Sequence, residues 1–317
     1  MFKKTIMIIG TGVLGSYLSK HFLNNGHNVY VTTRYKKVIY KNYNYNKIEK
    51  KVKFIKLNVL NKNEILRKIK QINPNFIYYF AGQSSIFISY KKKLETVNSN
   101  YYGALNFLKI LKKEKLKTKF YKASSGYIFD ILKYKKKKEI KYIKPNNPYV
   151  KSQIEAFKSV IKYRKMGVSC SSLIFFNIES PLKSSSFLLN KIRNFIKFKK
   201  TKFLKLGDIN AYRDFSWAPE IMMGVYYASK LTTQDIIFSS GKTFLIKDMV
   251  KYFFHINKLS YENFVVIDKK LYRKNEKKKL VSSVSNATQL LKKWRWNPKI
   301  YGKKLILKLN NSPIPKY

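Results

Sequence analysis

Short apolar runs alternate with amphipathic stretches along the first half of the chain. The run "TIMIIG" (5–10) predicts a buried strand, and "VLGSYLSKHFLNNG" (13–26) places its apolar residues at helical spacing. Gly26 ends this helix, and "HNVYVTTR" (27–34) predicts the next strand. The chain therefore opens with a strand, a helix and a second strand.

The same alternation continues to about residue 177. Further strands are predicted at "VKFIKLNVL" (52–60), "NFIYYFAG" (75–82), "KFYKASS" (119–125) and "VSCSSLIFFN" (168–177). Helices are predicted between them at "NEILRKIKQI" (63–72), "NYYGALNFLKILKKEK" (100–115) and from Tyr149 to about Lys165. This order predicts an α/β fold, a Rossmann-type doubly wound parallel sheet.

The second half of the chain alternates less regularly and predicts a smaller C-terminal lobe. We expect residues 1–176 to form the Rossmann domain, with part of 205–240 returning to it. Residues 177–317 form mainly the smaller lobe. The lysine-rich stretch 131–147 is typical of a solvated loop.

The composition is strongly basic, with a formal net charge of +51. Such a charge is typical of proteins that bind a polyanion. The lysines are nevertheless spread through every segment, together with many Asn, Ile, Tyr and Phe residues, all of which share A/T-rich codons. A biased genome explains this composition without a nucleic-acid partner, although the charge favours an anionic substrate.

Cysteine and histidine usage excludes two classes of site. The single cysteine, Cys170, cannot form an internal disulfide, and it fits a reducing cytoplasm. The three histidines, His21, His27 and His255, lack the short spacings of metal ligands, so no metal is expected. Because no run approaches about 20 apolar residues, we expect a cytoplasmic protein without a membrane span.

The stretch "GTGVLG" carries the first candidate chemistry. Gly10, Gly12 and Gly15 have the Gly-x-Gly-x-x-Gly spacing between a predicted strand and helix. In a dinucleotide site these glycines allow a tight turn, close approach of a pyrophosphate and close helix–strand packing. Arg34 ends the second strand where NAD enzymes usually have an acid, which favours NADP and leaves NAD open.

Several longer stretches resemble the extended short-chain dehydrogenase/reductases that act on nucleotide sugars, most closely the GDP-mannose 4,6-dehydratase family. The stretches are "FIYYFAGQSSIFISY", "FYKASSGYIFD", "NPYVKSQIEAF", "FFNIESP" and "LGDINAYRDFSWAPE", and "LYRKNE" and "LLKKWRWNPK" follow them. The resemblance runs nearly from end to end. It implies a nicotinamide cofactor, a GDP-hexose-like substrate, a substrate-binding C-terminal lobe and a homo-oligomer, either a dimer or a tetramer.

The resemblance also implies a role for individual residues. Ser125 would bind the reacting sugar oxygen, Tyr149 would be the acid/base, and Gln153 occupies the position of the usual lysine. The implied cofactor contacts are Gly10, Gly12, Val13, Leu14, Gly15, Arg34, Asn58, Ala81 and Gly82. The implied substrate contacts are Gln83, Ser84, Asn177, Glu179, Arg213, Arg273 and Glu276.

Two departures from the family pattern bear on activity. The lysine that would lower the pKa of Tyr149 is replaced by Gln153, which carries no charge. The carboxylate that removes a carbon-bound proton during dehydration is replaced by Tyr127. The resemblance keeps a dehydratase as the leading interpretation in spite of these departures. A 4-keto reductase, an epimerase, a catalytically impaired NADP or nucleotide-sugar binding protein and a basic nucleic-acid binder are the alternatives.

Overall fold

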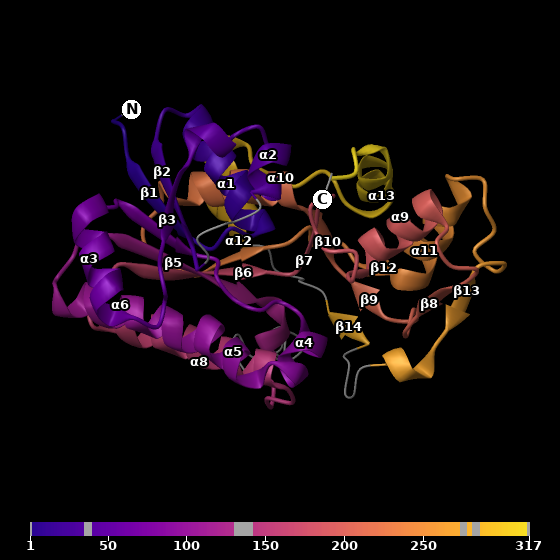
Figure 1. Cartoon of the computed structure of the whole chain (residues 1–317), viewed down its shortest axis with the longest axis horizontal. Coiled ribbons are helices and arrows are strands. Elements are labelled where there is room, and N and C mark those ends of the chain that lie inside the picture. The colour runs from indigo at the N-terminus through magenta and orange to yellow at the C-terminus, as the bar shows by residue number, and fades with distance from the viewer. Residues whose placement is uncertain (1, 35–39, 130–141, 273–277, 281–285, 316–317) are drawn as a thin grey trace. The chain divides into compact units, whose positions relative to one another are not determined.

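The computed structural model describes residues 2–34, 40–129, 142–272, 278–280 and 286–315 (Figure 1). Contacts between Cα atoms divide the chain into two compact units. Unit 1 comprises Met1–Phe175 and Met222–Phe238, and unit 2 comprises Phe176–Ile221 and Ser239–Tyr317. The helix α10 (Ala218–Ala228) contains the second boundary between them.

Unit 1 is built on a seven-stranded parallel sheet with the order β11-β6-β5-β4-β1-β2-β3. Its strands, in chain order, are β1 (Thr5–Ile9), β2 (Asn28–Thr33), β3 (Lys53–Lys56), β4 (Phe76–Tyr79), β5 (Lys119–Ser125), β6 (Cys170–Phe175) and β11 (Ile236–Phe238). From β1 the chain adds β2 and β3 on one side and then β4, β5 and β6 on the other. This reversal between β1 and β4 is typical of doubly wound dinucleotide-binding folds. The predicted fold class is confirmed.

Burial explains why these segments form strands. All six residues of β6 are buried, and the last four of β1 are buried as well. Parallel strands covered on both faces are continuous apolar runs rather than alternating ones. Strand β11 pairs with β6 through Ile236 opposite Leu173 and Phe238 opposite Phe175.

Helices cover both faces of the sheet (Figure 1). The helices of unit 1 are α1 (Val13–Asn24), α2 (Lys41–Tyr45), α3 (Lys62–Ile72), α4 (Ile86–Lys91), α5 (Lys93–Val97), α6 (Gly103–Lys113) and α8 (Pro148–Lys165). Shorter turns are the 3₁₀ helices η1 (Glu49–Lys51) and η3 (Gly126–Ile128) and the π-helix η2 (Asn98–Tyr102). The apolar pattern did not predict α2, α4 or α5, which are each only five or six residues long.

Each face of the sheet has its own packing. Ile65 of α3, Phe107 of α6 and Val160 of α8 share one apolar cluster with Phe120 of β5 on one face, where the rings of Phe107 and Phe120 stack. On the other face Phe22 of α1 packs against aromatic rings from the sheet and from α10, namely Phe76, Tyr78 and Tyr226. This rigid double layer holds the carboxyl ends of the strands in fixed positions.

The described residues of unit 2 form short strands and four helices, besides the start of α10. Its strands form three small sheets: β7 (Asn177–Glu179) with β10 (Phe215–Trp217); β9 (Tyr212–Arg213) between β12 (Phe244–Leu245) and β14 (Lys279–Leu280); and β8 (Leu204–Leu206) with β13 (Val265–Ile267). Its helices are α9 (Leu188–Phe198), α11 (Ile246–His255), α12 (Asn286–Leu290) and α13 (Gly302–Asn311), with 3₁₀ turns η4 (Lys269–Leu271) and η5 (Lys292–Trp294).

A separate apolar core holds unit 2 together. Ile192 of α9, Phe253 of α11 and Leu305 of α13 are fully buried in it. The ring of Phe244 packs under Gly302, where an added Cβ would come within 2.5 Å of the ring. Within the described part of the chain, no helix combines the length and the apolar character needed to cross a membrane.

Candidate active site

The glycine loop forms a cradle at the start of α1. Gly10 has φ +104°, and a Cβ there would lie 3.1 Å from the backbone of Ala81. A Cβ on Gly15 would lie 3.1 Å from the carbonyl oxygen of Gly10 and from the side chain of Ile8. A Cβ on Gly12 would meet nothing within 4 Å, so this side of the turn is open.

The open side is chemically suited to an anion. Val13 and Leu14 begin the 12-residue helix α1, and Gly12 at its N-cap supplies no side-chain cap. The first amide groups of a helix have no partner within the helix and carry partial positive charge. Together with the glycine cradle, they fit the pyrophosphate of a dinucleotide cofactor.

Two polar side chains that the motif did not identify support the loop. Thr32 of β2 accepts a hydrogen bond of 3.2 Å from the backbone N–H of Gly10. Asn42 of α2 donates one of 3.0 Å to the carbonyl oxygen of Thr11. Threonine and asparagine are common in this chain, so only the spatial neighbourhood reveals this role.

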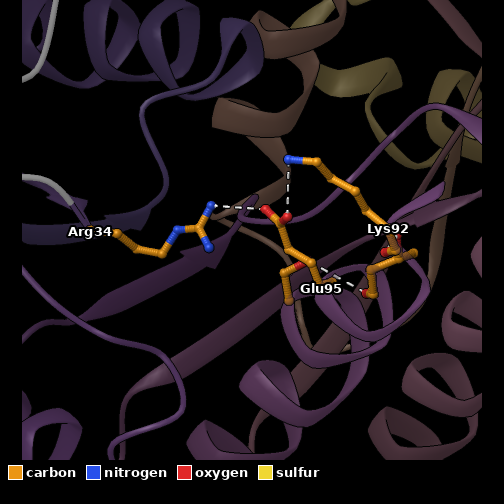
Figure 2. A network of polar contacts seen from close by, with 5 residues as sticks. Arg34, Lys92 and Glu95 are labelled. Atoms are coloured by element: carbon orange, nitrogen blue, oxygen red, sulfur yellow. Dashed lines mark hydrogen bonds and ion pairs between the residues drawn. The ribbon is translucent and has the colours of Figure 1, made fainter. Parts of the chain in front are cut away.

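Arg34 follows β2 and belongs to an exposed charge network centred on Glu95 (Figure 2). Its Nη2 atom lies 3.3 Å from Oε1 of Glu95 on α5. Lys92 Nζ lies 3.4 Å from the other oxygen of the same carboxylate. The Arg34 hydrogen bond holds the pKa of Glu95 below its usual range, with burial opposing it and Lys92 adding to it.

The loop after β4 is held by an asparagine from the π-helix η2. Asn100 Nδ2 donates to the carbonyl oxygen of Gln83 at 3.0 Å and to Ser152 Oγ of α8 at 3.2 Å. Gly82 has φ +151°, and a Cβ there would lie 2.0 Å from Asn100 Oδ1. Ser84 is exposed beside it. The loop and α8 are thus fixed to one another through Asn100.

Asn58 lies in an exposed turn after β3. Its Oδ1 atom accepts a hydrogen bond of 3.0 Å from the N–H of Leu60, and its own N–H donates to Glu64 Oε2 at 3.2 Å. Its side-chain oxygen therefore shapes the local turn. Its predicted contact with a cofactor stays a prediction.

Ser125 and Tyr149 come together at the end of β5 and the start of α8. Both side chains are buried, and they share a side-chain hydrogen bond. Burial raises the pKa of Tyr149 to about 12; the hydrogen bond with Ser125 lowers it and Tyr127 raises it. Tyr127 also donates its backbone N–H to Ser125 Oγ at 3.2 Å. Two hydroxyl groups suited to proton transfer therefore share one site.

Gln153 lies one helical turn after Tyr149 on α8, in the position predicted from the sequence spacing. Its side chain is buried, and its Oε1 atom has no hydrogen-bond partner among the described residues. Lys151, two residues after Tyr149, is exposed. No charged group on α8 therefore replaces the missing lysine at this position.

In unit 2, Asn177 is hydrogen-bonded to Asp214, the residue that follows Arg213 in the chain. Asn177 Nδ2 donates to the carbonyl oxygen of Asp214 at 3.0 Å. The Asp214 carboxylate accepts from the N–H groups of Ser240 and Gly241, at 3.0 and 2.9 Å. Arg213 is buried, and its Nη1 atom donates to the carbonyl oxygen of Tyr212 at 2.8 Å. Asp214 thus ties Asn177 at the start of β7 to the segment that directly follows Arg213 of β9.

Glu179 is buried on β7 and forms an ion pair with Lys183, at 2.7 Å. Burial raises the pKa of Glu179 and the charge of Lys183 lowers it. The Oε2 atom of this carboxylate has no partner among the described residues. The remaining predicted substrate contacts, Arg273 and Glu276, lie outside the described residues.

The other reactive side chains form no second centre in the described ranges. No group of three His, Cys, Asp or Glu side chains there could hold a metal ion. Cys170 is buried on β6, and burial raises the pKa of its thiol. An apolar environment makes a thiol unreactive, so Cys170 serves packing.

Comparison with known proteins gives a consistent result. Residues 8–309 match the family model described as GDP-mannose 4,6 dehydratase. GDP-mannose 4,6 dehydratase 1 of Arabidopsis thaliana is 26% identical over 323 residues, which cover 96% of this chain and 88% of that protein.

Solved structures share the fold at lower identity. A dTDP-glucose 4,6-dehydratase of Bacillus anthracis in complex with NAD has a TM-score of 0.79 at 15% identity, covering 97% of this chain and 95% of its own. RMD of Pseudomonas aeruginosa complexed with NADPH has a TM-score of 0.72 at 17% identity, covering 97% and 98%.

Proposed function

Because this chain belongs to the GDP-mannose 4,6-dehydratase family, whose model matches residues 8–309, we propose that it modifies a nucleotide sugar with a nicotinamide cofactor. The observation that carries this proposal is the hydrogen-bonded pair of Ser125 and Tyr149. It stands on the sheet whose glycine loop fits a dinucleotide. The favoured substrate is a GDP-hexose such as GDP-mannose.

The cofactor would be held by the glycine loop and the start of α1. Its pyrophosphate would receive the amide groups after Gly12. When bound, the nicotinamide supplies the hydride acceptor or donor for a sugar carbon. We propose NADP rather than NAD, because Arg34 directly follows β2 and an arginine in this region can accommodate a 2′-phosphate.

Ser125 and Tyr149 would act on the sugar oxygen at the carbon that changes oxidation state. The Ser125 hydroxyl would hydrogen-bond this oxygen and keep it beside Tyr149. Tyr149 would accept the hydroxyl proton as the carbon is oxidised and return a proton when the carbonyl is reduced. A phenol is a base only when ionised, so the rate depends on the ionised fraction of Tyr149.

Unit 2 would supply contacts to the nucleotide portion. An arginine fork matches phosphate oxygens in geometry and charge, so Arg213 is proposed to contact the diphosphate. The Asn177 amide would donate a hydrogen bond to a sugar or nucleoside group, and the Glu179 carboxylate would accept one. Asp214 supports this assignment because it anchors both Asn177 and the loop at Ser240.

A second candidate function follows from Tyr127. Loss of water from the sugar requires a base that removes a carbon-bound proton, and the family position for that carboxylate holds Tyr127. Hydride transfer alone requires only the hydroxyl pair. A 4-keto reductase or an epimerase acting on the same class of nucleotide sugar is therefore the second candidate.

The test is incubation of the full chain with NADP⁺ and GDP-mannose, and separately with NADPH and a GDP-4-keto-hexose, followed by mass spectrometry. A product 18 mass units lighter than GDP-mannose, about the mass of water, identifies a dehydratase. A product two mass units heavier than the keto sugar, about two hydrogens, identifies a reductase. Tyr149→Phe should abolish either product. An epimer has the mass of GDP-mannose and is detected by its separate chromatographic retention. Binding of both ligands with neither mass change and no epimer would contradict an enzyme and support a binding protein.

A further inference from the structure

Lys122 on β5 is a buried lysine without a role in the site as described so far. It is only 2% exposed, three residues before Ser125. Its Nζ atom donates a 2.5 Å hydrogen bond to the carbonyl oxygen of Ala123 and lies 5.6 Å from the centroid of the Tyr79 ring. An ammonium has three donors, so two lack a partner among the described residues. Burying a cation in this way is costly and calls for a reason.

The strand places Lys122 opposite α8. Side chains alternate along a strand, so Lys122 points to the same face as Phe120, which shares an apolar cluster with Val160 of α8. Phe120 lies opposite Cys170 of β6, whose Sγ donates to the carbonyl oxygen of Val160 at 3.3 Å. Helix α8 connects the parallel strands β5 and β6 and must run back against their direction. Lys122 is about 7 Å along β5 from Phe120. Gln153 is about 10 Å back along α8 from Val160. The two side chains therefore reach similar levels on facing surfaces.

The two side chains are chemically complementary. Gln153 has a buried Oε1 acceptor that no described residue satisfies. Two of the three N–H donors of Lys122 likewise have no partner among the described residues. A lysine side chain is long, with four rotatable carbons, so its ammonium can leave the Ala123 carbonyl for another acceptor nearby.

We propose that Lys122 supplies the positive charge that α8 lacks, by donating a hydrogen bond to Gln153 Oε1 and favouring the ionised form of Tyr149. Lys122 acts through Gln153 and is a positioning residue. The lysine of the family pattern is thus divided between two side chains, an amide on the helix and an ammonium on the strand. The inference rests on the proposed function, because Tyr149 matters here as the acid/base.

Other titratable groups lie close to this pair. Tyr79 of β4 lies under the ammonium of Lys122, and Tyr127 interacts electrostatically with Tyr149. Among the causes that shift the pKa of Lys122 no carboxylate appears; burial alone lowers it, to about 7. An ionised Tyr149 would be the anion that retains the proton on Lys122.

The experiment exchanges the two side chains. Lys122→Gln should lower kcat for hydride transfer about tenfold near neutral pH, the effect of about one pKa unit in Tyr149, with KM unchanged within about twofold. The exchange variant Lys122→Gln/Gln153→Lys restores a single cation and should recover most of the rate. An unchanged rate in Lys122→Gln, or an exchange variant no faster than Lys122→Gln, would overturn the proposal.

A third variant tests the proposal even if Lys122→Gln fails to fold. Gln153→Lys alone keeps Lys122 and adds a second cation at the same site, so the proposal expects no gain in rate. A rise of about tenfold in this variant would mean that the native site has no cation, and the proposal would be wrong.

A titration that needs no turnover separates this inference from the proposed function. The absorbance of tyrosinate is followed with pH in the cofactor-free chain, and the Tyr149→Phe curve is subtracted to leave the signal of Tyr149. With Lys122 present, part of Tyr149 should ionise below about pH 8, where Lys122 still holds a proton on a fraction of the molecules. A wild-type curve identical to that of Lys122→Gln in this range overturns the inference. Absence of any product with all variants refutes the proposed function, and the titration still decides the role of Lys122.

Discussion

Single side chains determine which proton transfers are available near Tyr149. Tyr127 offers a phenol where dehydration needs a carboxylate, and a phenol is ionised near neutral pH only when its pKa is strongly lowered. Burial acts in the opposite direction on Tyr149, whose pKa is raised to about 12. A buried phenol in this state is a poor base, so the centre depends on any cation that can reach it.

The buried amine of Lys122 should make the stability of the protein depend on pH. Its pKa is lowered by burial to about 7, whereas an unfolded lysine titrates near 10.4. Between these values the unfolded chain binds the extra proton. The free energy of unfolding should therefore rise with pH from about 7 to 10, by at most about 1.4 kcal/mol per unit from this group.

Lys122→Met tests this dependence by urea unfolding of the cofactor-free chain. The variant should be more stable than the wild type at pH 7, because it buries no charge. The advantage should shrink towards pH 10, where the wild-type amine is neutral in both states. Lys109→Met on the exposed side of α6 is the matched control and should show no such trend. A difference that does not vary with pH would mean that Lys122 keeps its ordinary pKa.

Contacts between elements determine how the segment after β2 and the loop after β4 are held. Arg34 at the end of β2 pairs with Glu95 of α5, so two elements far apart in sequence share one charge network. The π-helix η2 supplies Asn100, which ties the loop after β4 to α8. Such short π-helical segments are frequent at functional sites.

Glu95→Gln should strengthen NADP(H) binding by about two- to fivefold and leave NAD(H) binding nearly unchanged. The carboxylate competes with a 2′-phosphate for Arg34, and an exposed ion pair of this kind contributes only about 0.2–1 kcal/mol. Calorimetric titration of both cofactors measures the effect. Arg34→Ala is the counterpart and should remove the preference for NADP(H). Equal affinities for the two cofactors in the wild type would contradict the role of Arg34.

Gly82→Ala should weaken cofactor binding, whereas an alanine at another glycine with positive φ should not. The new methyl group would overlap Asn100 Oδ1, at 2.0 Å, and break the link between the loop and α8. Gly167→Ala is the matched control, because Gly167 also has positive φ, +88°, and open space around it. Both variants should lose stability by about 1 kcal/mol or more. Only Gly82→Ala should lower cofactor affinity, measured by fluorescence titration.

Elements long enough to show an apolar pattern could be predicted from the sequence. Short helices and contacts that form only on folding could not. The sequence pattern predicted all six of the first strands and the helix that carries Tyr149 and Gln153. It did not predict α4 and α5, because five or six residues show too little periodicity. The support of the glycine loop by Thr32 and Asn42 depends on neighbours that are close only after folding. The burial of Lys122 contradicts the usual exposure of lysine and has no signal in the sequence.

At the scale of the whole molecule, the net charge of +51 attracts any polyanion. If the charge reflects composition rather than recognition, binding to DNA should be non-specific. Its affinity should then fall on the order of 10³-fold between about 50 and 200 mM salt.

Filter binding with two unrelated DNA sequences measures this property, and the affinity for GDP-mannose over the same salt range is the internal control. That affinity should change by less than about tenfold, because the single diphosphate of GDP-mannose forms few ionic contacts that salt can screen. DNA binding that discriminates between the two sequences and persists at high salt would favour the nucleic-acid class instead.

The return of β11 to the sheet has a consequence for synthesis on the ribosome. Strand β6 (Cys170–Phe175) is entirely buried, yet its outer neighbour β11 (Ile236–Phe238) is translated only after the first part of unit 2. Until then the nascent chain exposes an apolar strand with unpaired N–H and C=O groups, which is a template for association with other chains. We expect the emerging polypeptide to need a holding chaperone during this interval, and the interval closes when β11 leaves the exit tunnel.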